Sequence, residues 1–221
     1  MLSQAARSGF LWGPAAAVIP SEAEEAHLER RRSADGDGLE GAIESVLDGE
    51  FISESRALLA GAVKRNGKTI FSAAAMNDVV VSRGAVGSMI EFAVTVDGEF
   101  IYSLRADGLI VATPTGSTAY ALSAGGPILH PALQAFALVP ISPHTLSNRP
   151  VAIRGSSKVE ITLVRGPEAR ANFDVQAFHE LEAGDVVTVS AAPKSATLLH
   201  PKGYRYFAML RQKLRWSERT A

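Results

Sequence analysis

The sequence of 221 residues contains no cysteine. Disulfide bonds, thiolate nucleophiles and cysteine-ligated metals are therefore excluded from this chain. No apolar run approaches the ~18 residues that a membrane-spanning helix needs. The formal net charge is only −1, so no electrostatic signature points to nucleic acid or an anionic membrane as a partner. A reducing compartment is compatible with these absences, and we expect a cytoplasmic protein without membrane or nucleic-acid partners.

Signatures of metal and hydrolase sites are also missing. The five histidines are not spaced as metal ligands, and no Walker-type lysine loop is present. A hydrolase triad of Ser117, His144 and Asp107 can be drawn, but the Gly-x-Ser-x-Gly pattern of a nucleophile elbow is absent. We therefore predict neither a metal site nor a hydrolase.

The N-terminal part of the chain differs from the rest. Residues 1–34 begin with a short apolar run that loosely resembles a secretion signal, but Pro14 interrupts it. A charged stretch follows, in which Ser21 and Glu24 form a capping-box pattern typical of a solvated helix or a disordered linker. Residues 35–50 then carry apolar residues at helical spacing, which predicts a helix over 39–47 ended by Gly49.

From residue 51 to residue 199 the sequence predicts short strands joined by turns. Asn66-Gly67 and Asp97-Gly98 are strong hairpin signals between alternating segments. Such a series favours a mainly β fold, a β-sandwich. Residues 200–221 return to helical spacing and predict a C-terminal amphipathic helix. The predicted strands are 56–64, 69–74, 77–82, 89–96, 100–104, 109–112, 136–139, 151–153, 158–164, 171–175, 185–190 and 196–199.

The stretch 105–129 is the most informative part of the sequence. A short apolar strand runs into a hydroxyl-rich turn over 113–118 and then a small-residue segment over 119–123. Ser117 or Thr118 can cap a helix there, and a capped helix start suits the phosphates and sugar hydroxyls of a nucleotide. An ordinary turn between a strand and a helix explains this stretch alone equally well.

Several further motifs occur in a fixed order with this stretch: Ala75-Met76-Asn77-Asp78-Val79-Val80-Val81, residues 139–150 (VPISPHTLSNRP), Asp174-Val175-Gln176 and His200-Pro201-Lys202-Gly203-Tyr204. Together they resemble the bacterial NAD kinase family over about residues 36 to 216. The resemblance implies an all-β NAD-binding domain over 51–199 and a C-terminal helix that packs on an N-terminal α/β domain.

We expect that N-terminal α/β domain to be largely absent from this sequence, because residues 1–34 are too few to build it and one βαβ unit alone takes ~30 residues. The family's Gly-Gly-Asp-Gly-Thr loop, which carries the catalytic Asp, has only a poor match in Asp35-Gly36-Asp37-Gly38. We therefore expect an N-terminally truncated NAD kinase in which residues 1–34 are atypical or non-native, and we assign no catalytic residue.

The resemblance implies a set of NAD-binding residues. Two of these, Arg105 and Asp107, are expected to reach a dinucleotide across a subunit interface, so a homo-oligomer is expected. The full set is Asn77, Asp78, Arg105, Asp107, Thr118, Ala119, Tyr120, Ala121, Leu122, Ser123 and Gln176.

The implied reaction transfers a phosphoryl group from ATP or polyphosphate to the adenosine ribose 2′-hydroxyl of NAD, with Mg²⁺ or another divalent cation. Because the loop is missing, we expect weak or no activity from this chain alone. The alternative is a non-catalytic NAD-binding module or an assembly partner of an intact subunit. A lipid kinase of the related superfamily fits the Arg105–Gly108 and Gly116–Tyr120 motifs less well.

Overall fold

The computed structural model describes residues 36–84, 88–145 and 147–216. The predictions for residues 1–34, including the capping box, lie outside the described residues. The chain divides into two units, one of residues 56–196 and one of residues 1–55 with 197–221. Strands β1 and β12 continue from one unit into the other.

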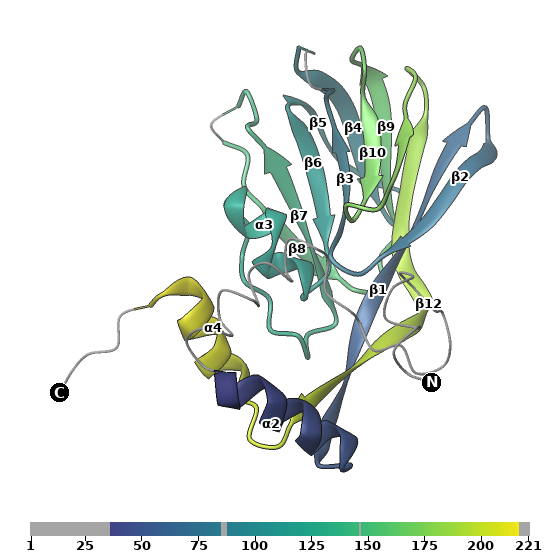
Figure 1. Cartoon of the computed structure of the whole chain (residues 1–221). Helices are drawn as coiled ribbons and strands as arrows, with labels where there is room; N and C mark the ends of the chain where they lie inside the picture. Colours follow the sequence, from purple (N-terminus) through teal and green to yellow (C-terminus); the bar gives the residue numbers. More distant parts are fainter. Residues whose placement is uncertain (1–35, 85–87, 146, 217–221) are drawn as a thin grey trace. The chain divides into compact units, whose positions relative to one another are not determined.

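The larger unit contains two six-stranded antiparallel sheets (Figure 1). The first sheet has the strand order β2-β1-β12-β9-β4-β5. Its strands are β1 (Phe51–Arg65), β2 (Lys68–Ala75), β4 (Ile90–Val96), β5 (Glu99–Ala106), β9 (Val159–Arg165) and β12 (Val186–Pro201). The second sheet has the order β11-β10-β3-β6-β7-β8. Its strands are β3 (Asp78–Ser82), β6 (Gly108–Ala112), β7 (Ala135–Ile141), β8 (Val151–Arg154), β10 (Arg170–Phe173) and β11 (Ala177–Glu180).

The core lies between the two sheets. Alternate residues of strands such as β4 and β9 are buried, as period-two alternation predicts. Phe92 of the first sheet and Phe136 and Phe173 of the second belong to one continuous buried cluster. Burial of each large apolar side chain contributes about 1.5 to 3 kcal/mol. The predicted mainly β sandwich is confirmed.

Strands β3 and β6 are buried on both faces. Their inner residues join the main core, while Val80 and Ile110 join a second cluster with Ala121 and Leu129. The segment that includes α3 (Tyr120–Ser123) therefore covers the outer face of the second sheet, beside β6 and β7 (Figure 1). This packing holds the stretch after β6 against the sheet.

Both predicted hairpin turns are confirmed. Asn66 and Gly67 have φ values of 51° and 76°, and Asp97 and Gly98 have φ values of 54° and 84°. Two consecutive residues with positive φ are the geometry of a type I′ turn, whose twist matches that of the flanking strands.

The structure corrects three sequence predictions. The strands predicted at 185–190 and 196–199 are one strand, β12, and the four-residue strand β11 was not predicted. The helix predicted at 119–123 is a 3-10 turn, Gly116–Thr118, followed by the four residues of α3. Neither piece has a side-chain cap at its start, so the predicted capping by Ser117 or Thr118 is wrong.

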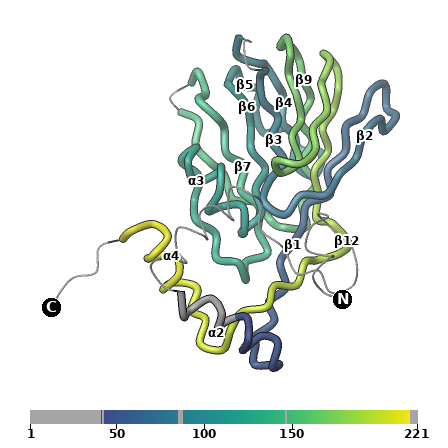
Figure 2. Tube along the Cα trace, in the orientation of Figure 1, coloured from purple at the N-terminus to yellow at the C-terminus, as the bar shows by residue number. Residues whose placement is uncertain are grey.

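The smaller unit contains α2 (Gly36–Leu47), α4 (Tyr206–Leu214) and the outer ends of β1 and β12. Figure 2 shows β1 and β12 running side by side, as their neighbouring places in the sheet require. The imidazole Nε2 of His200 lies 2.9 Å from Oε2 of Glu54, and its ring stacks on Tyr204. Within the described part of the chain, every helix is too short or too polar to cross a membrane.

Candidate functional site

Three segments that are far apart in the sequence meet at one end of the second sheet. They are the start of β3, the loop over 113–118 after β6, and the turn over 174–176 after β10. Strand β3 is antiparallel to both neighbours, so its start lies beside their ends. Asp78 is paired with Ala112 in that register. The structure thus brings Asn77 and Asp78 next to the segments that carry Thr118 and Gln176.

Asp174 holds the start of β3 by its carboxylate. Its Oδ2 accepts the backbone N–H of Met76 at 2.7 Å, and its Oδ1 accepts those of Asn77 and Asp78 at 2.8 and 3.1 Å. The backbone N–H of Asp174 donates in return to the carbonyl oxygen of Asp78 at 3.0 Å. Asp174 has a φ of 50°, a conformation that Asp tolerates better than most residues.

The loop after β6 holds the same segment from the other side. The backbone N–H of Thr113 donates to the carbonyl oxygen of Asn77 at 2.9 Å, and its hydroxyl donates to that of Met76 at 2.7 Å. The Thr113 hydroxyl also accepts the N–H of Gly116 at 3.0 Å. Gly116 lies so close to Asn77 that a Cβ atom on it would overlap the Asn77 backbone.

The Ser117 hydroxyl turns into the protein instead of capping a helix. It donates to the carbonyl oxygen of Pro114 at 2.6 Å and accepts the N–H of Leu129 at 2.9 Å. Thr118 donates its hydroxyl to the carbonyl oxygen of Thr115 at 3.2 Å. Because Ser117 is fully buried, its hydroxyl takes the backbone partners within reach. The expected capping of a helix by Ser117 is therefore not found.

Some predicted NAD-binding residues present side chains to solvent at this end of the sheet. Tyr120 is 48% exposed, and Ser123 and Gln176 are exposed as well. Thr118, Ala119 and Leu122 are half-buried, whereas Ala121 is fully buried in the outer cluster. Ala121 thus packs α3 against the sheet.

Asp78 has the most perturbed carboxyl group of this cluster. Its side chain is buried, and burial raises its pKa to about 6, with a further contribution from the negative charge of Asp174. A carboxyl group with such a pKa changes between hydrogen-bond donor and pure acceptor close to neutral pH.

Arg105 and Asp107 lie at the opposite end of β6. Asp107 directly precedes that strand, and its Oδ1 accepts a hydrogen bond from Nε of Arg83 at 2.6 Å. The backbone of Asp107 pairs with Arg83 and Ile141, at the far ends of the neighbouring strands. Arg105 is exposed, and its carbonyl oxygen accepts the N–H of His144 at 3.0 Å. Within one chain, the two residues are therefore not brought together with Asn77.

The same separation excludes the hydrolase triad. Ser117 follows the end of β6, whereas Asp107 precedes its start. The Ser117 hydroxyl is also occupied by backbone partners. These three residues therefore do not form a catalytic triad.

The sequence does not reveal two structural contributions to this cluster. Asp174 stands in the Asp174-Val175-Gln176 motif, but no local pattern shows that it organises the start of β3 from almost a hundred residues away. Arg56 on β1 is 5% exposed, and its Nη1 donates to the Thr115 hydroxyl at 3.3 Å. The one signal for Arg56 in the sequence is a charged residue at the start of a predicted strand whose next residues are apolar.

The described residues contain no group of three or more His, Asp or Glu side chains that could hold a metal ion. Two carboxylates approach each other at Asp78 and Asp174, but the oxygens of Asp174 already accept backbone N–H groups. The divalent cation that the family resemblance implies therefore does not fit this part of the chain.

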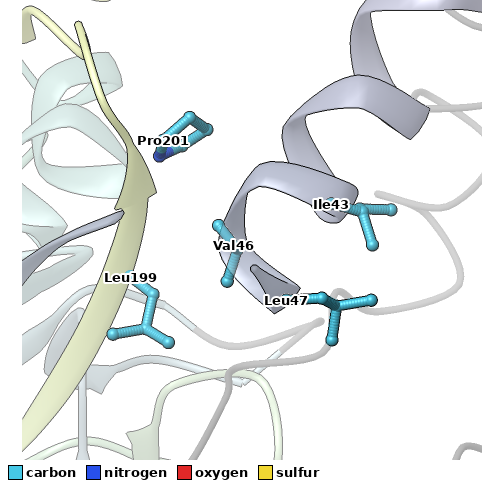
Figure 3. Close-up of a pocket in the computed structure, with 5 residues that line it drawn as sticks. All are labelled: Ile43, Val46, Leu47, Leu199 and Pro201. Atoms are coloured by element: carbon cyan, nitrogen blue, oxygen red, sulfur yellow. The ribbon is translucent and has the colours of Figure 1, made fainter. Parts of the chain in front are cut away.

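A cavity of about 260 Å³ lies in the smaller unit. Figure 3 shows Val46 and Leu47 of α2 on one side and Leu199 and Pro201 of β12 on the other, with Ile43 completing the lining. All five side chains are apolar. The cavity offers no polar side chain for chemistry, so it is not a candidate active site.

Comparison with known proteins identifies the family. Residues 76–200 match the family model of the ATP-NAD kinase C-terminal domain. The chain is 51% identical over 178 residues to an NAD kinase of Thiobacillus denitrificans and 55% identical over 178 residues to one of Chromobacterium violaceum. Each match covers 80% of this chain and 61% of the relative. The chain thus spans about three fifths of the length of these curated relatives.

Solved structures agree with this result. Yeast NADH kinase complexed with NADH superimposes with a TM-score of 0.75 at 27% identity, over 85% of this chain and 55% of that one. An NAD kinase from Archaeoglobus fulgidus in complex with ATP gives a TM-score of 0.62 at 28% identity, over 79% and 64%. Both share the two-sheet domain described above. The chain belongs to the NAD kinase family, whose C-terminal domain it carries.

Proposed function

We propose that this chain binds NAD at the end of the second sheet where β3, β6 and β10 meet. The observation that carries this proposal is the convergence of Asn77-Asp78, the segment 118–123 and Gln176 in a domain of the NAD kinase family. A relative with the same fold was crystallised with NADH. A cytoplasmic location belongs to the proposal, because the proposed substrates are metabolites of that compartment.

The side chains of this cluster suit a dinucleotide. The amide of Asn77 and the carboxyl group of Asp78 can hydrogen-bond ribose hydroxyls and the edge of adenine. Tyr120 offers an exposed aromatic face on which a base can stack. Gln176 adds a second amide from the turn after β10.

We propose that Arg105 and Asp107 act in the site of a second copy. They lie at the opposite end of β6 from Asn77, so they are not part of the same cluster in one chain. A homo-oligomer in which copies exchange these residues would complete the site. Arg83 would orient the Asp107 carboxylate through their ion pair.

In this proposal the domain positions the acceptor for phosphoryl transfer from ATP or polyphosphate to the ribose 2′-hydroxyl. Positioning of the two reactants is the main contribution a protein makes to this reaction. These 221 residues contain no Gly-Gly-Asp-Gly-Thr loop. A polypeptide of these 221 residues is therefore expected to bind NAD and to form little or no NADP alone.

The second candidate is a non-catalytic NAD-binding module that assembles with an intact subunit. This candidate needs only the residues proposed to bind NAD, and no Gly-Gly-Asp-Gly-Thr loop. Mixing the chain with an intact NAD kinase from a related bacterium distinguishes the two, because an assembly partner would co-elute with the intact enzyme in size-exclusion chromatography.

Titration calorimetry of the purified chain with NAD tests the proposal, and an enzymatic assay for NADP measures turnover in the same sample. We expect saturable NAD binding without turnover. Phe100→Ala is the control, because Phe100 is an exposed aromatic residue outside the cluster. Absence of NAD binding would refute the binding proposal, and robust NADP formation would refute the expectation of inactivity.

A further inference from the structure

The start of β3 has every backbone polar group of Met76, Asn77 and Asp78 engaged. Asp174 accepts all three N–H groups and donates its own N–H to the carbonyl oxygen of Asp78. Thr113 donates to the carbonyl oxygens of Met76 and Asn77. The segment therefore has no freedom to rotate a peptide plane without losing a hydrogen bond.

The contacts of Asp174 are stronger than those of Thr113. An ionised carboxylate that accepts backbone N–H groups makes charge-assisted hydrogen bonds, which are about twice as strong as neutral ones. Three such bonds converge on one side chain, at 2.7, 2.8 and 3.1 Å. Asp174 thus contributes the larger part of the restraint on Asn77 and Asp78.

We propose that Asp174 is a positioning residue for NAD binding, which fixes the backbone that carries Asn77 and Asp78. This inference rests on the proposed function. Asp174 acts through Asn77 and Asp78 and need not touch the nucleotide itself.

The electrostatic part of the role follows from the surroundings of Asp78. β6 places the apolar Ala112 beside it, and the turn after β10 places the carboxylate of Asp174 near it. Arg56 of β1 reaches the same loop through Thr115. Burial and the charge of Asp174 both raise the pKa of Asp78 to about 6. The ionised form accepts hydrogen bonds from both hydroxyls of a ribose, so NAD affinity should rise as pH increases through this range.

Asp174→Asn is the decisive variant. The amide keeps one oxygen as an acceptor but replaces the other by an NH₂ group, which cannot accept the N–H of Met76. It also removes the charge. NAD affinity at about pH 8 should fall roughly 10-fold, as expected when a charge-assisted bond worth about 1.5 kcal/mol is lost. The midpoint of the affinity–pH curve should move to lower pH, which a merely structural role would not cause.

Asp97→Asn is a matched control. Asp97 also has a positive φ, and its Oδ1 also accepts a backbone N–H, that of Lys158 at 2.8 Å. It lies in the turn between β4 and β5 of the first sheet, whereas the cluster is formed by strands of the second sheet. Its variant should leave NAD affinity and the midpoint unchanged.

Calorimetric titration with NAD from about pH 5 to about pH 8 provides the readout. If the wild-type chain binds NAD and Asp174→Asn binds it equally, with the same midpoint, the positioning role is refuted and the proposed function stands. If the wild-type chain does not bind NAD, the proposed function fails and this inference fails with it.

Hydrogen exchange on the free wild-type chain keeps the inference testable if Asp174→Asn does not fold. The backbone amides of Met76, Asn77 and Asp78 should exchange slowly, as amides of the core strands do. Exchange as fast as in an exposed turn would show that Asp174 does not restrain them and would overturn the inference.

Discussion

Gly116 packs directly against the backbone of Asn77, with no space for a side chain between them. This contact joins the loop after β6 to the start of β3. Both segments form part of the proposed NAD site. The neighbour of Gly116 is backbone and not a flexible side chain, so it cannot move aside without disturbing the hydrogen bonds of Asn77.

Gly116→Ala should therefore lower both stability and NAD affinity. Overpacking of this kind typically costs about 1 to 3 kcal/mol, measurable by urea denaturation. Gly41→Ala is the control, because a Cβ atom at Gly41 in α2 meets nothing within 4 Å. Alanine is the better helix former, so that variant should be as stable as the wild type or more so. Unchanged stability and NAD affinity in Gly116→Ala would contradict the packing described above.

Tyr120→Ala separates binding from folding. Because the side chain is about half exposed, its removal should cost little stability. Loss of an aromatic stacking contact should weaken NAD binding roughly 3- to 10-fold. Calorimetry measures the affinity and thermal denaturation the stability, with Phe100→Ala as the matched aromatic control. If both variants bind NAD with equal affinity, Tyr120 does not contribute to NAD binding.

The elements that local signals determine were predictable from the sequence. The dipeptides Asn66-Gly67 and Asp97-Gly98 each predict a turn with two positive φ values, and the structure has both turns. The period of two along β4 and β9 was likewise sufficient to place their buried faces.

The architecture of the candidate site was not predictable in the same way. The hydroxyl of Ser117 could cap a helix or bind the backbone of Leu129, and only the tertiary fold decides which. Asp174 acts on residues almost a hundred positions earlier, so no local pattern reveals it. The sequence predicts two strands in place of β12 because the residues between them include a proline and a lysine. In the structure these residues are mostly exposed, yet the strand continues through them to Pro201.

Asp78 should make folding stability depend on pH. Its pKa is raised from 3.8 to about 6 in the folded chain, so the folded state holds the proton more tightly than the unfolded state. Stability should therefore fall as pH rises from about 4 to about 7, by roughly 2 to 3 kcal/mol from this group. Asp78→Asn should remove this dependence in urea denaturation series.

Asp97→Asn should act with the opposite sign. The backbone N–H of Lys158 holds the pKa of Asp97 below its usual value, so its stabilisation is present above the unfolded pKa and is lost as pH falls. For Asp78, the contradicting outcome is a curve of stability against pH that is the same in the wild type and in Asp78→Asn. That result would show that burial does not raise the pKa of Asp78.

Arg65 and Asp185 form a two-bonded ion pair that should be important for stability. Nε and Nη2 of Arg65 donate to the carboxylate of Asp185 at 2.9 and 2.8 Å, and the Asp185 side chain is only 1% exposed. Arg65→Met would leave this buried carboxylate with the backbone N–H of Glu182 as its remaining hydrogen-bond partner. We expect a lower free energy of unfolding at neutral pH, because the charge of Asp185 is buried and loses its cationic partner.

The loss in Arg65→Met should shrink in acid. The hydrogen bond from Arg65 is the main cause that lowers the pKa of Asp185, so the pair stabilises above the unfolded pKa and this contribution disappears as pH falls. Lys158→Met is the control, because Lys158 pairs with Glu160 on an exposed surface and should cost less than about 1 kcal/mol. Equal losses in both variants would contradict the difference in burial.

The smaller unit should cause self-association. Ile43, Leu47 and Leu199 line one apolar cavity, and Leu47 is 77% exposed. Contiguous exposed apolar surface of this kind favours contact with another protein surface over contact with water. Further exposed apolar residues of this unit are Phe51, Ile52, Phe207 and Trp216. Light scattering coupled to size-exclusion chromatography should give a mass above that of the monomer, increasing with concentration.

Leu47→Lys should shift this equilibrium toward the monomer, because a charge in the apolar surface must be desolvated on association. Leu133→Lys is the matched control. Leu133 is also an exposed leucine, at 50%, but it lies in a loop of the larger unit and does not line the cavity. If the wild-type chain is a stable monomer at all concentrations, or if both variants dissociate it equally, the apolar surface around Leu47 does not drive association.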